Sequence, residues 1–91
     1  GNFDFDFFPT AIDYYPSHLN IFMKSPGSAV LYIYDTYGRL KFSEYYSATY
    51  PSQIIQDEIP VQNMLLGIYI VAVVVGEEIQ YKTFAKVTNF N

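Results

Sequence analysis

The strongest constraint on the fold comes from one apolar segment, Leu65-Leu66-Gly67-Ile68-Tyr69-Ile70-Val71-Ala72-Val73-Val74-Val75. A glycine, one spacer and a tyrosine stand at the head of a row rich in β-branched residues, which favour strands. A tyrosine in this position can turn its hydroxyl back onto the preceding loop and form a tyrosine corner. The segment therefore predicts a central strand of a β-sandwich, with Tyr69 at its start.

The rest of the chain fits an all-β, immunoglobulin-like antiparallel β-sandwich of about seven strands. Val71 stands where antibody domains place their second cysteine. Turn signals separate the predicted strands, at residues 10–15, 18–23, 29–35, 39–46, 53–59, 67–75 and 79–88. Helical spacing is nowhere kept for three turns, and the best helical candidate is a single turn near residues 62–65.

The length of 91 residues predicts a single domain, because a chain of this size buries only about 60% of its unfolded surface and needs one dense core. We assign residues 9–91 to the sandwich. Residues 1–8 include an alternation of phenylalanine and aspartate from Phe3 to Phe7, and they predict either an edge strand or an N-terminal arm that adds to the sheet of a neighbour. Strand exchange or a dimer through residues 2–8 is one expectation from this pattern.

Alternation along the strands assigns side chains to the core, since residues two apart share a face. The predicted inward positions are Leu19, Ile21, Leu31, Ile33, Leu40, Phe42, Ile55, Ile59, Val61, Tyr69, Val71 and Val73, with Met64 closing the corner. Phe84 and Val87 cannot share a face in a regular strand, so we expect a bulge or one exposed side chain.

The strand at residues 67–75 is also apolar on its outward row, at Ile68, Ile70, Ala72 and Val74. The outer face of a two-layer sandwich normally meets water and carries polar residues. We therefore expect this row to be covered by neighbouring tyrosines, by the N-terminal segment or by another molecule.

Charge and composition exclude several classes of partner. The net charge of -4 and the five scattered basic residues argue against nucleic acid, which is bound by clustered Lys and Arg. The longest apolar stretch, residues 64–75, is too short to cross a bilayer core of about 30 Å, so no membrane insertion is expected. The lack of cysteine removes disulfides, thiolate metal sites and cysteine nucleophiles.

No arrangement of residues predicts catalysis or a metal site. His18 is the only histidine and lacks nearby ligands or a nucleophile. The adjacent carboxylates of Asp57-Glu58 and Glu77-Glu78 diverge to opposite faces of a strand. Asp4 and Asp6 share a face but match no calcium-binding loop. We expect no enzyme activity, no cofactor and no metal.

The polar residues around one predicted hairpin have a structural explanation. Asp35 can cap its own turn, Gly38 can supply a positive φ, and Arg39 can pair with Asp35. Together with Gly67 and Tyr69 at the corner, they form the predicted structural set.

Tyrosines are the candidates for binding a ligand. Tyr32 and Tyr34 lie on the strand face opposite Leu31 and Ile33, Tyr37 follows in the turn, and Tyr45 lies on the next strand. Tyrosine rings give large contact areas at low cost in side-chain entropy, which suits protein interfaces and stacking on sugars. The same rings can instead stabilise the sheet through cross-strand pairs of roughly 0.2–1 kcal/mol each. The sequence leaves both roles open.

Two stretches resemble a pattern found in exported proteins of the Bacteroidetes, namely Leu31-Tyr32-Ile33-Tyr34-Asp35-Thr36-Tyr37-Gly38-Arg39-Leu40 and Ile59-Pro60-Val61-Gln62-Asn63-Met64-Leu65-Leu66-Gly67-Ile68-Tyr69-Ile70-Val71. One family with this pattern comprises small secreted Bacteroides proteins of unknown function with an immunoglobulin-like sandwich. The other is the C-terminal sorting domain of type IX secretion cargo. The resemblance covers residues 9–88, and its specific part is core and turn chemistry.

The resemblance implies a non-enzymatic exported module that is secreted, periplasmic or at the cell surface, and that interacts with protein or glycan at the cell envelope. The alternative is a sorting domain read by the type IX machine. Residues 8–13 lack the Tyr-Pro-Asn-Pro opening of that domain, whereas residues 81–87 fit the closing strand of both families. No leader peptide is visible, and Gly1 resembles a residue left by tag removal. A leader before Asn2 would favour the first family and an upstream domain the second.

Overall fold

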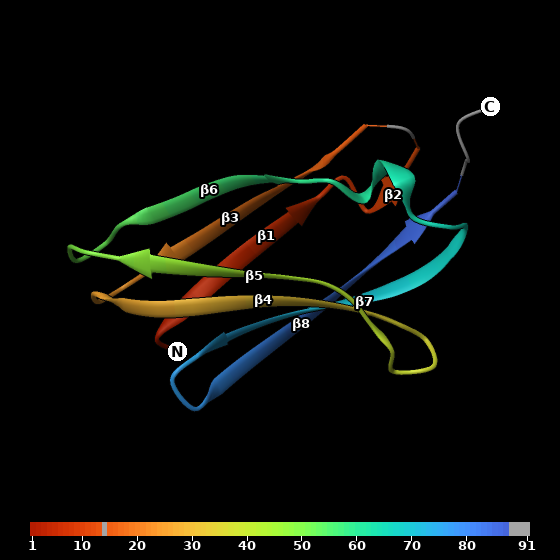
Figure 1. Ribbon diagram of the computed structural model, residues 1–91. Coiled ribbons are helices and arrows are strands. Elements are labelled where there is room, and N and C mark those ends of the chain that lie inside the picture. Colours follow the sequence, from red (N-terminus) through yellow and green to blue (C-terminus); the bar gives the residue numbers. More distant parts are fainter. Residues whose placement is uncertain (14, 88–91) are drawn as a thin grey trace.

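Alternating apolar residues form the two facing sheets of a β-sandwich (Figure 1). The computed structural model describes residues 1–13 and 15–87. Its elements are β1 (Phe3–Phe8), β2 (Ala11–Ile12), β3 (Ser17–Met23), β4 (Gly27–Asp35), β5 (Leu40–Ala48), β6 (Ile54–Ile59), the 3-10 helix η1 (Val61–Asn63), β7 (Gly67–Val75) and β8 (Glu78–Lys86).

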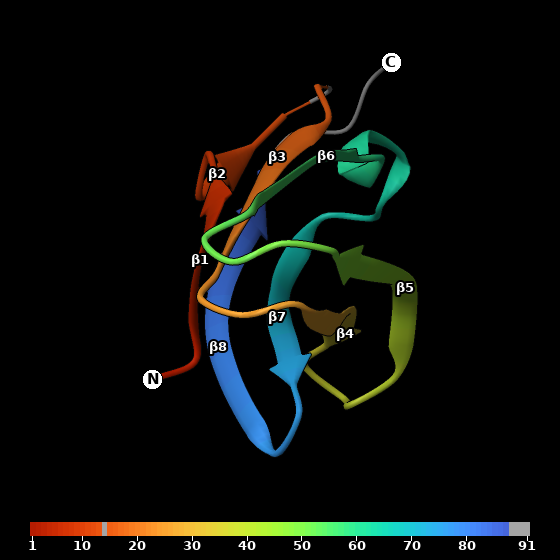
Figure 2. The same ribbon diagram turned by 90° about the vertical axis from the view of Figure 1, so that its left-hand side faces the viewer.

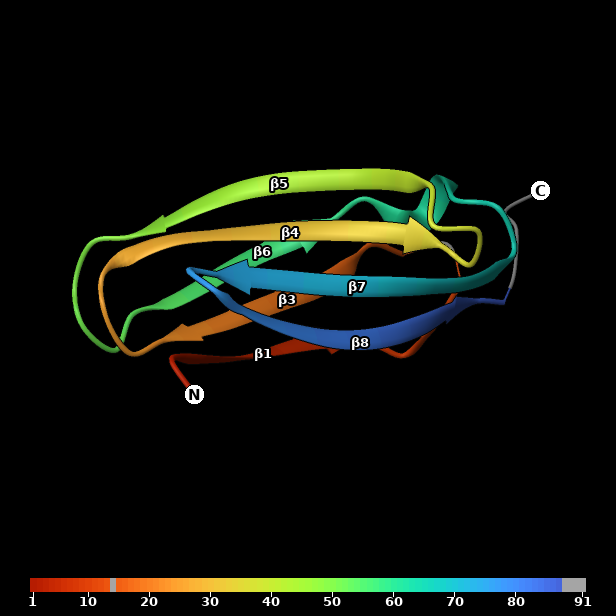
Figure 3. The same ribbon diagram turned by 90° about the horizontal axis from the view of Figure 1, so that it is seen from below.

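One layer has three strands in the order β1-β3-β6, and the other has five in the order β2-β8-β7-β4-β5 (Figures 2 and 3). Neighbouring strands are antiparallel except β2 and β8, which run parallel. Strands β4 and β7 lie in the middle of the larger sheet, with β5 and β8 on either side. This architecture confirms the predicted all-β immunoglobulin-like sandwich.

The N-terminal segment crosses from one sheet to the other. Strand β1 pairs with β3, and after the cis peptide bond between Phe8 and Pro9 the short strand β2 pairs with β8. Residues 3–8 thus hold an edge-strand position within the same chain. The strand predicted at 10–15 was too long, since only Ala11–Ile12 pair, and residue 14 lies outside the described residues. Residue 88, the last of the predicted 79–88 strand, also lies outside them.

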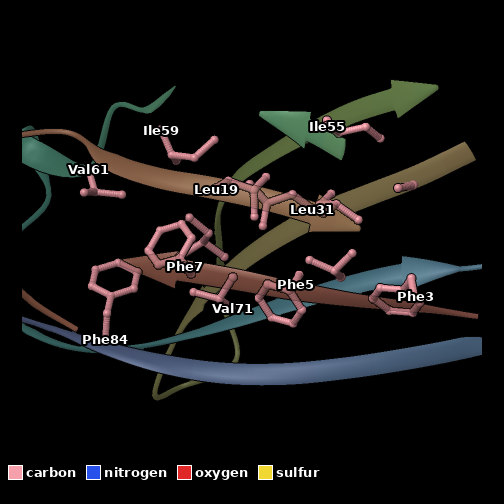
Figure 4. Close-up of a cluster of buried hydrophobic side chains, with 14 of the residues drawn as sticks. Phe3, Phe5, Phe7, Leu19, Leu31, Ile55, Ile59, Val61, Val71 and Phe84 are labelled. Atoms are coloured by element: carbon pink, nitrogen blue, oxygen red, sulfur yellow. The ribbon is translucent and has the colours of Figure 1, made fainter. Parts of the chain in front are cut away.

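The core lies between the sheets and takes side chains from both (Figure 4). Phe3, Phe5 and Phe7 project from β1 into this layer, because residues two apart share a strand face. Most of the predicted core positions are buried, as the structure shows for Leu19, Ile21, Leu31, Ile33, Ile55, Ile59, Val61, Tyr69, Val71 and Val73. Phe42 and Met64 are only partly buried and pack against the cluster.

The prediction that Leu40 belongs to the core is wrong. Its side chain is 52% exposed, because the register between β4 and β5 shifts between Ile33 and Tyr34. Ile33 pairs with Phe42 whereas Tyr34 pairs with Leu40, so one extra residue lies on β5. This irregularity turns Leu40 to the outside of the sandwich, on the same face as Tyr34.

On β8, Phe84 is buried, and Val87, which follows the strand, is exposed. This confirms the expectation that one of these two side chains faces solvent.

Candidate functional site

The outer side of the five-stranded sheet has an extended surface without a charged side chain. It is formed by every second residue of β4, β5, β7 and β8, since strand residues alternate between the core and the outside. We call it the uncharged face, and its residues are Ser28, Val30, Tyr32, Tyr34, Leu40, Ser43, Tyr45, Ser47, Ile68, Ile70, Ala72, Val74, Ile79, Tyr81, Thr83 and Ala85.

Strand register aligns much of this face in three rows that run from β5 through β4 and β7 to β8. The rows are Tyr45-Val30-Val74-Ile79, Ser43-Tyr32-Ala72-Tyr81 and Leu40-Tyr34-Ile70-Thr83. The rings of Tyr32 and Tyr34 lie next to each other, with centroids 6.1 Å apart. Tyrosine, aliphatic and hydroxyl side chains therefore form one continuous surface.

The outward row of β7 is only partly covered by its neighbours. Ala72 is buried between Tyr32 and Tyr81 in the adjacent strands, but Ile68 is exposed and Ile70 is half-buried. Strand β1 belongs to the other sheet, so the N-terminal segment does not cover this row. Neighbouring tyrosines thus account for part of the cover predicted from the sequence, and the rest of the row faces outward.

Charged side chains are concentrated elsewhere on the molecule. The outer face of the three-stranded sheet presents Asp4 and Asp6 from β1 and Glu58 from β6, all exposed. Glu44 pairs with inward-facing Leu31, so it does not belong to the uncharged face. Lys41 is the unpaired residue at the register shift of β5 and is exposed at the margin of this face. Among the described residues, the sandwich therefore has one acidic outer face and one outer face whose paired outward residues carry no charge.

The other sheet carries a shallow hollow of about 620 Å³. It is lined by Phe8, His18, Asn20, Gln56, Asp57 and Glu58. His18 is exposed at the start of β3, and its ring stacks on that of Phe8 with centroids 5.4 Å apart. Among residues 1–13 and 15–87, no group of three or more His, Cys, Asp or Glu side chains is placed to hold a metal ion.

The four tyrosines predicted to bind a ligand do not form one cluster. Tyr32, Tyr34 and Tyr45 lie together on the uncharged face. Tyr37 lies apart from them in the turn after β4, where it is 83% exposed and the Arg39 guanidinium is 5.1 Å from its ring centroid. The structure thus brings together three of the four residues.

The turn that contains Tyr37 is built on Asp35. One carboxylate oxygen of Asp35 accepts hydrogen bonds from the backbone amides of Tyr37 and Arg39, each at 2.9 Å, and the other accepts one from Nε of Arg39 at 2.6 Å. Burial acts to raise the pKa of Asp35, but these hydrogen bonds and the positive charge of Arg39 outweigh it and lower the pKa below its ordinary value. Gly38 has a φ of +79°. These residues have the structural roles predicted from the sequence.

The corner before β7 also has its predicted geometry. The hydroxyl of Tyr69 donates a 2.7 Å hydrogen bond to the backbone carbonyl of Leu65, and the ring is stacked on Phe84 with centroids 5.1 Å apart. Burial and the nearby negative charge of Asp35 raise the pKa of Tyr69. Gly67 has a φ of +146°, which side chains with a Cβ rarely adopt. This corner marks the start of β7, one of the four strands that form the uncharged face.

Sequence reasoning missed the contribution of β8 to the uncharged face. Ile79, Tyr81, Thr83 and Ala85 all point outward there, opposite the outward residues of β7. Their alternation with Gln80, Lys82, Phe84 and Lys86 was visible in the sequence. Applied to this strand, the period-two rule would have added Ile79 and Tyr81 to the candidate surface.

In the described part of the chain, no helix has both the length and the apolar character needed to span a membrane. No protein-family model matches the chain, and no curated protein matches its sequence.

Proposed function

We propose that this protein is a non-enzymatic, exported interaction module of the cell envelope, which binds a protein partner through the uncharged face. The observation that carries the proposal is the continuous set of tyrosine, aliphatic and hydroxyl side chains across four strands, without one charge. Large exposed apolar surfaces are rare on monomeric proteins and mark contact sites.

Side-chain exposure supports a contact surface rather than sheet packing alone. Tyr45 and Tyr81 are each 64% exposed, and Ile68 and Ile79 are about half exposed. Sheet packing explains the half-buried rings of Tyr32 and Tyr34, but it does not explain why the apolar side chains around them are exposed to solvent. Aromatic side chains dominate binding energy where they cluster at the centre of an interface.

The chemistry of the face favours a protein over a glycan. Sites for small polar ligands are concave and combine apolar walls with several polar groups. The centre of the uncharged face is formed by side chains of the neighbouring strands β4 and β7, and its polar groups are hydroxyls alone. The hollow beside Phe8 and His18 has more polar groups, but it lies on the opposite sheet.

The location of the proposed module rests on the resemblance in the turn and corner sequences. A secreted, periplasmic or surface position follows from the families that share these sequences. The same resemblance includes the type IX sorting domain, in which the secretion machine itself would be the partner. Deleting the domain from the gene product that contains it distinguishes an interaction module from a sorting domain, because only the loss of a sorting domain stops export of an attached cargo.

The double variant Tyr32→Ser, Tyr34→Ser tests the proposal. We expect it to lose binding to the envelope proteins that the parent chain captures, with an unchanged fold by circular dichroism. The matched control is Phe22→Ser, Tyr50→Ser, which removes two exposed rings outside the uncharged face. Equal binding by the parent and the Tyr32, Tyr34 variant would overturn the proposal. If the Tyr32, Tyr34 variant lost binding to glycans but kept binding to proteins, the partner would be a glycan and not a protein.

A further inference from the structure

The uncharged face matches the requirements of a surface that meets a copy of itself. We propose that two copies of this chain associate through their uncharged faces into a dimer with two-fold symmetry. The inference rests on the proposed function and names its partner. It follows from the area, the charge distribution and the hydroxyl groups of the face.

The area of the face is large enough for a stable dimer. Strands β4, β5, β7 and β8 each have nine residues. At about 3.3 Å per residue and about 4.8 Å between strands, they cover roughly 19 Å by 30 Å, or about 600 Å². Two such faces bury about 1,200 Å² in total, which reaches the lower end of the range for specific stable interfaces.

The charge distribution favours an identical partner over a charged one. Each chain carries a net charge of -4, so two copies repel each other wherever acidic surfaces approach. The uncharged face is where contact avoids this repulsion, because Asp4, Asp6 and Glu58 lie on the opposite sheet. A basic or acidic partner would find no charge to pair with on this face. A second copy presents an uncharged surface of the same size.

The polar groups of the face are suited to pairing with themselves. In a two-fold interface the same patch is used on both subunits. The polar side chains of the face are hydroxyls, and a hydroxyl can both donate and accept a hydrogen bond. Ser43, Ser47 and Thr83 lie on β5 and β8, on either side of a centre on β4 and β7 that consists mainly of aliphatic side chains and tyrosine rings. This arrangement of apolar centre and polar margin is typical of protein interfaces.

The variant Ser43→Glu, Thr83→Glu tests the dimer directly. Both positions are exposed and flank the centre of the face on opposite sides, so the change adds charge without removing an apolar contact. The control Ser25→Glu, Thr36→Glu makes the same chemical change at exposed positions in two turns outside the face. Circular dichroism and thermal melting check that both variants remain folded.

Sedimentation of the purified chain measures its mass in solution and so whether it is a monomer or a dimer. We expect the parent and the control to have twice the mass of one 10.5 kDa chain at micromolar concentration. The dimer of the face variant should have a dissociation constant at least about 100-fold higher than that of the parent dimer, because like charges brought together in an interface repel. Raised salt should not dissociate the parent, since apolar contacts are not screened.

A charge-swap experiment removes any ambiguity about folding. Ser43→Arg, Thr83→Arg should also be monomeric alone, and an equimolar mixture with the glutamate variant should restore dimers with one chain of each kind. Such mixed dimers form only if the two faces meet. A dimer that survives both variants, for example one made by exchange of residues 2–8, would overturn the inference. A monomeric parent would overturn the dimer as well, but the Tyr32→Ser, Tyr34→Ser variant would still test the proposed function separately.

Discussion

The hydroxyl of Tyr69 and the backbone carbonyl of Leu65 are joined by a 2.7 Å hydrogen bond. This bond closes the loop that leads from η1 to β7. The ring of Tyr69 is only 4% exposed and points into the core, while Ile68 and Ile70 on either side point to the uncharged face. Tyr69 therefore sets which residues of β7 are buried and which are presented outside.

Replacing Tyr69 with phenylalanine should lower the free energy of unfolding by about 1 kcal/mol, because the ring keeps its packing and only the corner hydrogen bond is lost. Urea denaturation measures the change. Tyr50→Phe is the control, since Tyr50 is exposed outside the uncharged face and its hydroxyl makes no hydrogen bond within the described residues. A midpoint for Tyr69→Phe equal to that of the parent would show that the corner bond adds no stability.

Gly38→Ala should destabilise the protein by about 1 kcal/mol or more, since a residue with a Cβ is strained at positive φ. The φ of Gly38 is +79°, and a Cβ added there meets no atom within 4 Å. The cost would therefore come from the backbone conformation and not from a clash. Thr36→Ala in the same turn is the control. Equal melting temperatures for the parent and Gly38→Ala would contradict the turn geometry.

The Asp35 carboxylate should make stability depend on acid pH. Its pKa in the folded protein lies below its value in the unfolded chain, so the unfolded state binds a proton more readily. The stability from Asp35 is present above the unfolded pKa of about 3.9 and is lost as pH falls through the folded pKa. Urea midpoints measured from neutral to strongly acid pH should differ between the parent and Asp35→Asn at neutral pH, and this difference should shrink in acid. A constant difference would exclude ionised Asp35 as the cause.

Phe5→Ala should cost about 3–5 kcal/mol, because it empties part of the core that β1 fills. Phe5 is buried between the sheets, whereas Phe22 on β3, which pairs with the adjacent Asp4, is exposed on the outer face. Phe22→Ala therefore serves as the control with a much smaller effect. Equal, small losses in both variants would mean that β1 does not contribute its side chains to the core in solution.

Local rules predicted the parts of this fold that depend on residues close together in the sequence. The Gly67 to Val75 strand has the predicted bounds, because its corner and its β-branched row act within one segment. The same is true of the Asp35 turn, whose hydrogen bonds span four residues. Burial on β3, β4 and β7 followed from period-two alternation.

The sequence-based predictions were wrong or incomplete where pairing with a neighbouring strand decides which way a side chain points. Leu40 is exposed because of a register shift between β4 and β5, which no residue pattern within β5 reveals. The uncharged face needs four strands in register, and the sequence pointed to Tyr32, Tyr34 and Tyr45 without their neighbours Ile79 and Tyr81. Pairing between strands is a property of the folded sheet, so the full surface became visible only in three dimensions.

Hydroxyl-radical footprinting of tyrosines tests most directly whether the uncharged face is a protein contact surface. Tyr45 and Tyr81 on the face are each 64% exposed, and Tyr37 and Tyr50 outside it are 83% and 58% exposed, so all four rings react in the isolated chain. In intact cells that carry the protein, we predict slower oxidation of Tyr45 and Tyr81 relative to Tyr37 and Tyr50, compared with the dilute purified chain. The same ratio of rates in both samples would contradict the account, because it would leave the face open to solvent where the protein works.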